Sequence, residues 1–254
     1  GSIICDTGLI LGLACVISPL PFNRQLVNRQ GWVQFGAGVL LVAACVPWED
    51  PLSVFRTGSN LSQIWGFIFV GLLVVYMAWS IRLARQTPKD GSSEQLAIEN
   101  GKSGLILLRL LGAVVFVVVS SMSLIAAAEL LAERIGIPPS VIAATVVAFG
   151  TSLPELVIAM TAVRKNQGDL AVGNVIGADV LNVLFVAGLS GAVTVGGLDA
   201  HPHFFYMQFP AMLLILAVFR IGIWCARDNR LQRSFGIVLL TAYVAVTILS
   251  YFLA

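Results

Sequence analysis

The sequence predicts an all-α, polytopic membrane bundle, and three observations support this class. Hydrophobic residues make up 58% and charged residues 11% of the 254 positions, whereas soluble domains average roughly 45–50% and about 25%. The apolar residues form runs close to the roughly 20 positions that a helix needs to cross a bilayer. Leu, Val, Ala and Ile fill these runs without the alternation of apolar and polar residues that a transmembrane barrel requires.

Eight apolar runs are expected to be helical spans, at about 1–20, 31–48, 62–82, 104–132, 138–163, 169–196, 204–226 and 231–253. Basic residues are concentrated in one set of alternate loops: Arg24, Arg29, Arg82, Arg85, Lys89, Lys102, Arg164, Lys165, Arg227, Arg230 and Arg233. The opposite set contains only Arg56 and Arg134. The positive-inside bias therefore assigns the first set to the cytoplasm. We expect an integral protein of the cell (inner) membrane whose helices contact the lipid bilayer.

A polar segment divides the chain into two parts. Residues 85–103 are rich in Gly, Ser and charge and are expected to form a cytoplasmic linker. Residues 1–84 hold the first three spans, and residues 104–254 hold the other five. The chain begins without an initiator Met or a charged n-region. We therefore expect about eight spans of a longer protein that has about ten.

The first residues resemble a later span. GSIICDTGLILGLA aligns with GADVLNVLFVAGLS, which pairs Gly1 with Gly177 and Asp6 with Asn182. The first span runs toward the basic side and the sixth runs away from it. Two related segments of opposite orientation predict an inverted repeat, a topology in which substrate sites lie near the midplane between interrupted helices.

The polar stretch Gly150–Glu155 interrupts the fifth apolar span. A carboxylate near the centre of a membrane helix costs at least about 2.5 kcal/mol on insertion scales, so Glu155 is a candidate functional residue. Pro154 lacks an N–H, so the carbonyl near Gly150 loses its helical partner and becomes a possible oxygen ligand. Thr151 and Glu155 are four residues apart and share a helix face, with Ser152 beside them.

The sixth span contains a second set of polar residues. Asn174 and Asn182 lie on one predicted helical stripe, and Asp179 is displaced from it by about one hundred degrees. Two interpretations of Asp179 remain open, a cation ligand and a hydrogen bond to a neighbouring helix. Gly173 and Gly177 are spaced as in the small-residue pattern that allows close helix packing.

Together these residues predict a site for a hard cation. Carboxylate, amide, hydroxyl and carbonyl oxygens are the ligands of Ca²⁺, which takes six to eight of them. The absence of His and Cys from the set argues against zinc or copper. The sequence has no GxxxxGK[ST] loop for ATP. The set suits Ca²⁺ or Na⁺ better than a soft metal. We expect no enzyme activity, no bound cofactor and no nucleic-acid partner.

VAFGTSLPELVIAM followed by LAVGNVIGADVLNVLFVAG resembles the second α-repeat of the sodium/calcium exchangers, within the cation/Ca²⁺ antiporter superfamily. The resemblance implies a ten-helix fold with two inverted repeats and one central site at which Na⁺ and Ca²⁺ compete. The span pattern from 1 to 254 corresponds to the part of this fold from within its third helix to its tenth. The expected function is a secondary antiporter that exchanges Ca²⁺ for Na⁺ by alternating access.

The same resemblance implies roles for individual residues. Glu155 would be a ligand shared by Ca²⁺ and Na⁺, with Thr151 and Ser152 supplying carbonyl or hydroxyl oxygens. The other implied positions are polar residues of the first and sixth spans: Asn182, Asp6 and the hydroxyl of Ser2. The chain departs from the commoner pattern at Ala178, where a Ser is frequent.

Three alternatives remain open from the residues alone. A cation/H⁺ antiporter would use the same carboxylates to bind protons. A fragment without transport activity would act only through assembly with other chains. An intramembrane aspartyl protease is disfavoured, because Gly177–Asp179 reads GAD rather than the GxGD of that family.

Overall fold

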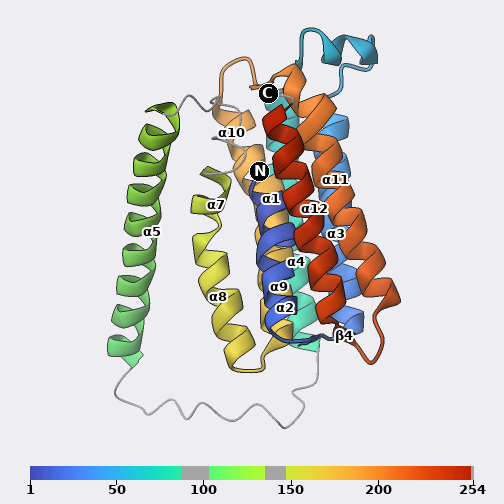
Figure 1. Ribbon diagram of the computed structural model, residues 1–254. Helices are drawn as coiled ribbons and strands as arrows, with labels where there is room; N and C mark the ends of the chain where they lie inside the picture. The colour runs from blue at the N-terminus through green and yellow to red at the C-terminus, as the bar shows by residue number, and fades with distance from the viewer. Residues whose placement is uncertain (87–102, 135–146, 253–254) are drawn as a thin grey trace.

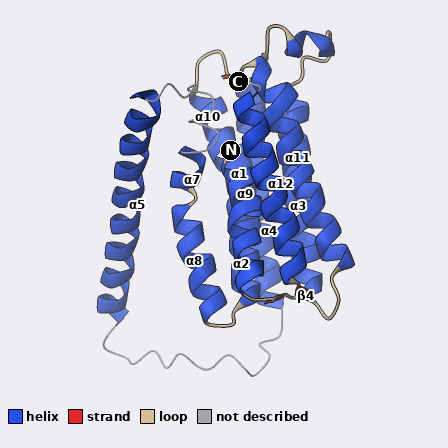
Figure 2. Ribbon diagram, in the orientation of Figure 1, coloured by secondary structure: helices blue, strands red, loops and turns tan. Residues whose placement is uncertain are grey.

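The computed structural model describes residues 1–86, 103–134 and 147–252, and it shows a bundle of long helices with two short strand pairs (Figures 1 and 2). The described chain is mostly helical, as predicted. Most of the predicted linker at 85–103 and the start of the predicted span at 138–163 lie outside the described residues.

The first part of the chain contains α1 (Ser2–Ile4), the π-helical segment η1 (Cys5–Ile10), α2 (Leu11–Ile17), β1 (Leu20–Pro21), α3 (Arg24–Cys45), the 3₁₀ segment η2 (Pro51–Phe55), β2 (Ser59–Leu61) and α4 (Gln63–Gln86). The second part contains α5 (Ser103–Arg134), α7 (Ala148–Thr151), α8 (Leu153–Arg164), α9 (Gly168–Leu181), the π-helical segment η4 (Asn182–Ala187), α10 (Gly188–Val193), β3 (Leu198–Ala200), the π-helical segment η5 (Phe204–Gln208), α11 (Phe209–Cys225), β4 (Arg230–Leu231) and α12 (Arg233–Phe252).

Four described helical stretches are long and apolar enough to cross a membrane: Gln63–Leu83, Gly168–Val193, Phe204–Cys225 and Arg233–Phe252. Each corresponds to a predicted span, whereas the total of eight stays a prediction. Many large apolar side chains on these helices face outward, among them Phe67, Val74 and Trp224. Outward-facing apolar side chains suit helices that are surrounded by lipid.

Helix α3 begins earlier than the sequence predicted. The apolar run suggested a start near residue 31, but the helix extends from Arg24 to Cys45. The Asn23 side chain accepts hydrogen bonds from the backbone N–H groups of Gln25 and Leu26, both at 3.1 Å, so it caps a polar first turn that hydropathy does not detect. The helix ends where Val46 becomes extended before a proline.

Two antiparallel strand pairs join the two parts of the chain. Strand β1 pairs with β4, so that Leu20 lies opposite Leu231. Strand β2 pairs with β3, so that Leu61 lies opposite Leu198. Each pair therefore takes one strand from before residue 86 and one from after residue 103, and the two pairs lie at opposite ends of the bundle (Figure 1).

Two helix pairs show the tightest backbone approach. Helix α2 packs against α12, and α10 packs against α4. A Cβ atom at Gly236 of α12 would lie 2.7 Å from the Gly12 carbonyl oxygen, and one at Gly66 of α4 would lie 2.3 Å from the Ala192 nitrogen. Glycine at these positions allows two backbones to come into direct contact. Helix α5 lies at the edge of the bundle, where it contacts α7 and α8 (Figure 1).

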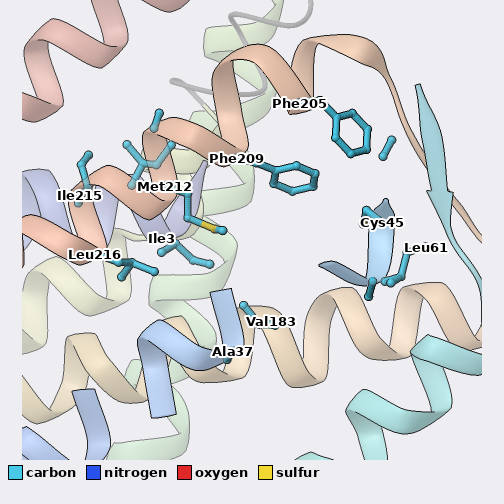
Figure 3. Close-up of a cluster of buried hydrophobic side chains, with 14 of the residues drawn as sticks. Ile3, Ala37, Cys45, Leu61, Val183, Phe205, Phe209, Met212, Ile215 and Leu216 are labelled. Carbon is cyan, nitrogen blue, oxygen red and sulfur yellow. The ribbon is translucent and has the colours of Figure 1, made fainter. Parts of the chain in front are cut away.

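The buried apolar side chains form two clusters. One contains Ile3, Val183, Phe209 and Met212, and Figure 3 shows these side chains between the surrounding helices. The other is built mainly from α2, α8 and α9, with Phe219 of α11 fully buried in it. The polar segments described next lie where α1, η1, α8 and α9 meet.

Candidate functional site

The helix that contains the Gly150–Glu155 stretch is interrupted, as predicted from Pro154. Helix α7 ends at Thr151 and α8 begins at Leu153, with Ser152 at φ −91° and ψ 3° between them. Glu155 lies in the first turn of α8. The N-terminal end of a helix carries partial positive charge, so this position favours a carboxylate.

Gly150 lies at a close contact between helices. A Cβ atom at this position would lie 2.3 Å from Cγ1 of Ile125 on α5. The glycine therefore allows the interrupted helix to approach α5. The N–H of Ser152 bonds the carbonyls of Ala148 and Phe149, at 3.2 and 3.1 Å.

Asp6 and Asn182, paired in the sequence alignment, face each other in the structure. The Asn182 Nδ2 group donates to Asp6 Oδ2 at 3.5 Å. Asp6 lies in η1 and Asn182 begins η4, so both occupy π-helical segments. Such wide turns are rare in α-helices overall, and those that occur are often found at functional sites.

Two further contacts connect the predicted site residues. The hydroxyls of Ser2 and Thr151 are 2.9 Å apart and share a hydrogen bond. The Asn174 side-chain amide donates to the backbone carbonyl of Glu155 at 3.5 Å. The structure therefore brings α1, the break between α7 and α8, and α9 together around one polar region.

Asp179 binds side chains that the sequence analysis did not select. Its Oδ2 atom accepts hydrogen bonds from Thr7 Oγ1 at 2.6 Å and from Gln34 Nε2 at 2.5 Å. Gln34 Nε2 also lies 3.3 Å from Thr7 Oγ1. Of the two interpretations of Asp179, the hydrogen bond to a neighbouring helix is therefore present. Gln34 could have been selected because it is an amide inside the predicted apolar span 31–48. A buried amide requires a hydrogen-bond partner.

Several buried oxygens in this region have no hydrogen-bond partner within the described part of the chain. They are Asp6 Oδ1, Gln34 Oε1, Ser152 Oγ, Glu155 Oε2 and Asp179 Oδ1. A buried polar atom without a partner costs about 1–3 kcal/mol, and more when it is charged. Acceptor oxygens of this kind are the ligands that a hard cation takes in proteins.

The carboxylates of the region also interact through their charges. Asp6 experiences the charge of Glu155, and Asp179 experiences the charge of Asp6. Within the described ranges, no three His, Cys, Asp or Glu side chains converge as a metal-binding group. Any ion bound here would therefore depend on hydroxyl and amide oxygens as well as on carboxylates.

A cavity of about 270 Å³ leads into the site, and its lining includes Ser2, Asn182, Ser190 and Gln208. Leu198 of β3 also lines it. The cavity therefore extends from Asn182 to strand β3, at the end of the bundle opposite the end that carries β1 and β4 (Figure 1).

The described residues show no close helix contact at Gly173 and Gly177. A Cβ atom at either glycine would meet no atom of the described residues within 4 Å. The close approach occurs instead at glycines of α2, α4, α10 and α12. Spacing alone does not distinguish a glycine that faces a helix from one that faces open space.

Comparison with known proteins gives concordant results. The family model described as sodium/calcium exchanger protein matches residues 1–82 and 105–252. The inner membrane protein YrbG of Escherichia coli is 31% identical over 260 residues, an alignment that covers 100% of this chain and 76% of YrbG. The sodium/calcium exchanger MaX1 of Methanosarcina acetivorans is 38% identical over 125 residues, covering 48% of this chain and 34% of MaX1.

Solved structures give the same fold. The sodium-calcium exchanger NCX_Mj, soaked with 2.5 mM Na⁺ and 1 mM Sr²⁺, superposes with a TM-score of 0.71 at 24% identity, covering 98% of this chain and 74% of that one. The family match extends over both parts of the chain on either side of the undescribed segment at 87–102. The chain belongs to the sodium/calcium exchanger protein family, a family of membrane transporters.

Proposed function

We propose that this chain is a secondary active antiporter that exchanges Ca²⁺ for Na⁺ by alternating access. The observation that supports this proposal most directly is the set of five buried oxygens on Asp6, Gln34, Ser152, Glu155 and Asp179 that have no hydrogen-bond partner among the described residues. Three of these residues are carboxylates. Bound cations would neutralise the carboxylates and satisfy the free acceptors.

The proposed ligands are those predicted from the sequence: Glu155, Thr151, Ser152, Gly150, Asn174, Asn182, Asp6 and Ser2 for both ions, and Asp179 for Na⁺. Glu155 would be the principal shared ligand for Ca²⁺ and Na⁺, because it combines a free carboxylate oxygen with a position at a helix break. Asn182 would provide an amide oxygen after rotation of its side chain. Membership in a family of sodium/calcium exchangers supports these two ions as substrates.

An inverted repeat accounts for several features that recur in the two parts of the chain. The alignment of Asp6 with Asn182 also superimposes the two π-helical segments, η1 and η4. The same relation exchanges α2 with α10 and α4 with α12. It therefore makes the contact of Gly236 of α12 with α2 equivalent to the contact of Gly66 of α4 with α10. It also exchanges the β1–β4 pair with the β2–β3 pair.

This repeat suits alternating access, because two related halves can adopt two equivalent arrangements around a fixed site. The halves would be residues 1–84 and 104–254, joined by a cytoplasmic linker at 85–103. The end of the bundle with β1 and β4 contains basic residues of the predicted cytoplasmic loops, such as Arg230. The cavity at Asn182 would then open toward the opposite side of the cell (inner) membrane.

Glu155→Gln tests the function. The substitution removes the charge while conserving the size of the side chain, so we expect Na⁺-driven ⁴⁵Ca²⁺ uptake into proteoliposomes to be lost and the thermal stability in detergent to be retained. Gly71→Ala on α4 is a control, because a Cβ atom there meets no described atom within 4 Å. Unchanged uptake in Glu155→Gln would reject the site.

The driving ion is tested separately. We expect ⁴⁵Ca²⁺ uptake to require an outward Na⁺ gradient and to be absent when only a pH gradient is imposed in Na⁺-free medium. Uptake driven by the pH gradient alone would replace Na⁺ coupling with the cation/H⁺ alternative, in which the carboxylates bind protons.

A further inference from the structure

The Thr7–Gln34–Asp179 cluster is more deeply buried than the rest of the site. The three residues come from η1, α3 and α9, and their exposed fractions are 0%, 2% and 1%. They are linked by the hydrogen bonds from Thr7 and Gln34 to Asp179 Oδ2. None of the three is needed to complete the Asp6–Asn182 or the Ser2–Thr151 contact.

The proposed inverted repeat identifies the equivalent positions in the other half. The alignment that pairs Asp6 with Asn182 also pairs Ile3 with Asp179 and Thr7 with Val183. The strand pairs make Leu20 equivalent to Leu198, since these residues lie opposite Leu231 and Leu61. Gln34 on α3 and Met212 on α11 follow these two leucines by the same number of residues, so they are equivalent positions. Burial agrees with this register, because the paired positions Val27 and Phe205, Gly31 and Phe209, and Ala37 and Ile215 are all buried.

The equivalent cluster in the second half is apolar. Ile3, Val183 and Met212 are all buried, and Figure 3 shows them within one hydrophobic cluster. The fold therefore accommodates ordinary apolar packing at this place. A buried carboxylate and a buried amide are more costly than apolar side chains of similar volume. Their presence in only one half is thus not explained by the packing of the helices.

The hydrogen bonds leave specific oxygens free. Both donors bind Asp179 Oδ2, whereas Asp179 Oδ1 and Gln34 Oε1 have no partner among the described residues. Thr7 donates its proton to Asp179 and retains acceptor capacity on its oxygen. In metal sites, outer-shell residues orient a carboxylate ligand by hydrogen bonds to one oxygen and leave the other oxygen for the ion. Thr7 and Gln34 hold Asp179 in this way.

We propose that Asp179, Gln34 and Thr7 form a Na⁺ site beside the Glu155 site, present in only one half of the repeat. The set offers one negative charge and two neutral oxygens, which suits a monovalent cation better than Ca²⁺ with its six to eight ligands. Asp179 is the charged ligand of this site, and Thr7 and Gln34 both hold it in place and contribute oxygens. The inference rests on the proposed antiport, to which it adds a separate position for the driving ion.

Binding of the two ions to the 254-residue chain in detergent tests this site. We would measure ²²Na⁺ and ⁴⁵Ca²⁺ binding for Gln34→Met and Thr7→Val, which install the residue types of the other half. Loss of an outer-shell partner lowers metal affinity by roughly 10- to 100-fold, so we expect a shift of that order in the Na⁺ concentration at half-saturation. We expect the half-saturating Ca²⁺ concentration to stay within about twofold of the unmodified value, because the Glu155 ligands are intact.

Two further variants serve as controls. Met212→Leu changes the equivalent apolar position in the other half and should leave binding of both ions unchanged. Thr7→Ser retains the hydroxyl and should bind Na⁺ normally, which would separate loss of the oxygen from a packing defect. Thermal unfolding in the same detergent identifies any variant that does not fold.

Specific results would overturn the proposal. Unchanged ²²Na⁺ binding in folded Gln34→Met and Thr7→Val would do so, as would the absence of ²²Na⁺ binding to the unmodified chain. An equal loss of both ions would indicate one shared site. Glu155→Gln distinguishes the two proposals: it should lose ⁴⁵Ca²⁺ binding and keep the Na⁺ position at Asp179. If Glu155→Gln retains transport, the antiport site fails independently of the Na⁺ result.

Discussion

The glycine-packed helix pairs and the interrupted helices of the site differ in their contacts. The pairs are in direct backbone contact, whereas the site contains buried oxygens without hydrogen-bond partners among the described residues. In the α2–α12 and α4–α10 pairs, glycine brings one backbone against another with no room for a methyl group. In the site, Ser152, Asp6 and Glu155 keep buried oxygens without hydrogen-bond partners in the described chain. The comparison indicates that the pairs provide rigidity and that the breaks provide unsatisfied ligands.

Gly66→Ala should have the largest effect on this comparison. The added Cβ would lie 2.3 Å from the Ala192 nitrogen, which belongs to the backbone and has no side-chain freedom. Overpacking of this kind costs about 3 kcal/mol or more, so we expect little folded protein on size-exclusion chromatography. Gly71→Ala on the same helix is the matched control. A stable Gly66→Ala variant would show that α4 and α10 are not tightly joined.

Gly236→Ala should have the same kind of effect at the equivalent place in the other pair. The nearest atoms would be Cys15 Cβ and the Gly12 carbonyl oxygen, each at 2.7 Å. Because one of them belongs to a small side chain, we expect a loss of about 1–3 kcal/mol, measured as a lower thermal midpoint in detergent. If Gly236→Ala is as stable as the unmodified chain and Gly66→Ala is not, the α2–α12 and α4–α10 pairs are packed differently.

Asn182→Asp alters the site rather than the helix pairs. It replaces a donor that lies 3.5 Å from Asp6 Oδ2 with a second carboxylate. Higher ligand charge favours Ca²⁺ over Na⁺, so we expect the Ca²⁺ concentration for half-maximal ⁴⁵Ca²⁺ uptake to fall roughly tenfold. Asn60→Asp, in strand β2, adds the same charge away from the site and is the control. An unchanged Ca²⁺ requirement would remove Asn182 from the ligand set.

Gly177→Ala should have the smallest effect. A methyl group at this position meets no described atom within 4 Å, and alanine is favoured over glycine in a helix by roughly 0.5–1 kcal/mol. We expect the thermal midpoint to stay the same or to rise slightly. A marked loss of stability would restore the predicted GxxxG contact at Gly173 and Gly177.

Hydropathy and motif spacing predicted the helical membrane class and the break at Pro154, and the resemblance to the exchangers implied that Asp6 and Asn182 belong to one site. They did not predict the start of α3, because its first turn is polar and held by the Asn23 cap. They also did not predict the π-helical turns at Asp6 and Asn182, since one wider turn leaves no mark on an apolar run. Gln34 was missed because its partners, Thr7 and Asp179, lie far from it in the sequence.

The two strand pairs make each half of the molecule dependent on the other. Strands β1 and β2 pair with β4 and β3, which follow them by more than one hundred residues. During synthesis, the first half therefore leaves the ribosome with two open edges that close only when the second half arrives. Two polypeptides divided between α4 and α5 would accordingly recognise each other through these edges, and the complete bundle would assemble from its halves without a peptide bond between them.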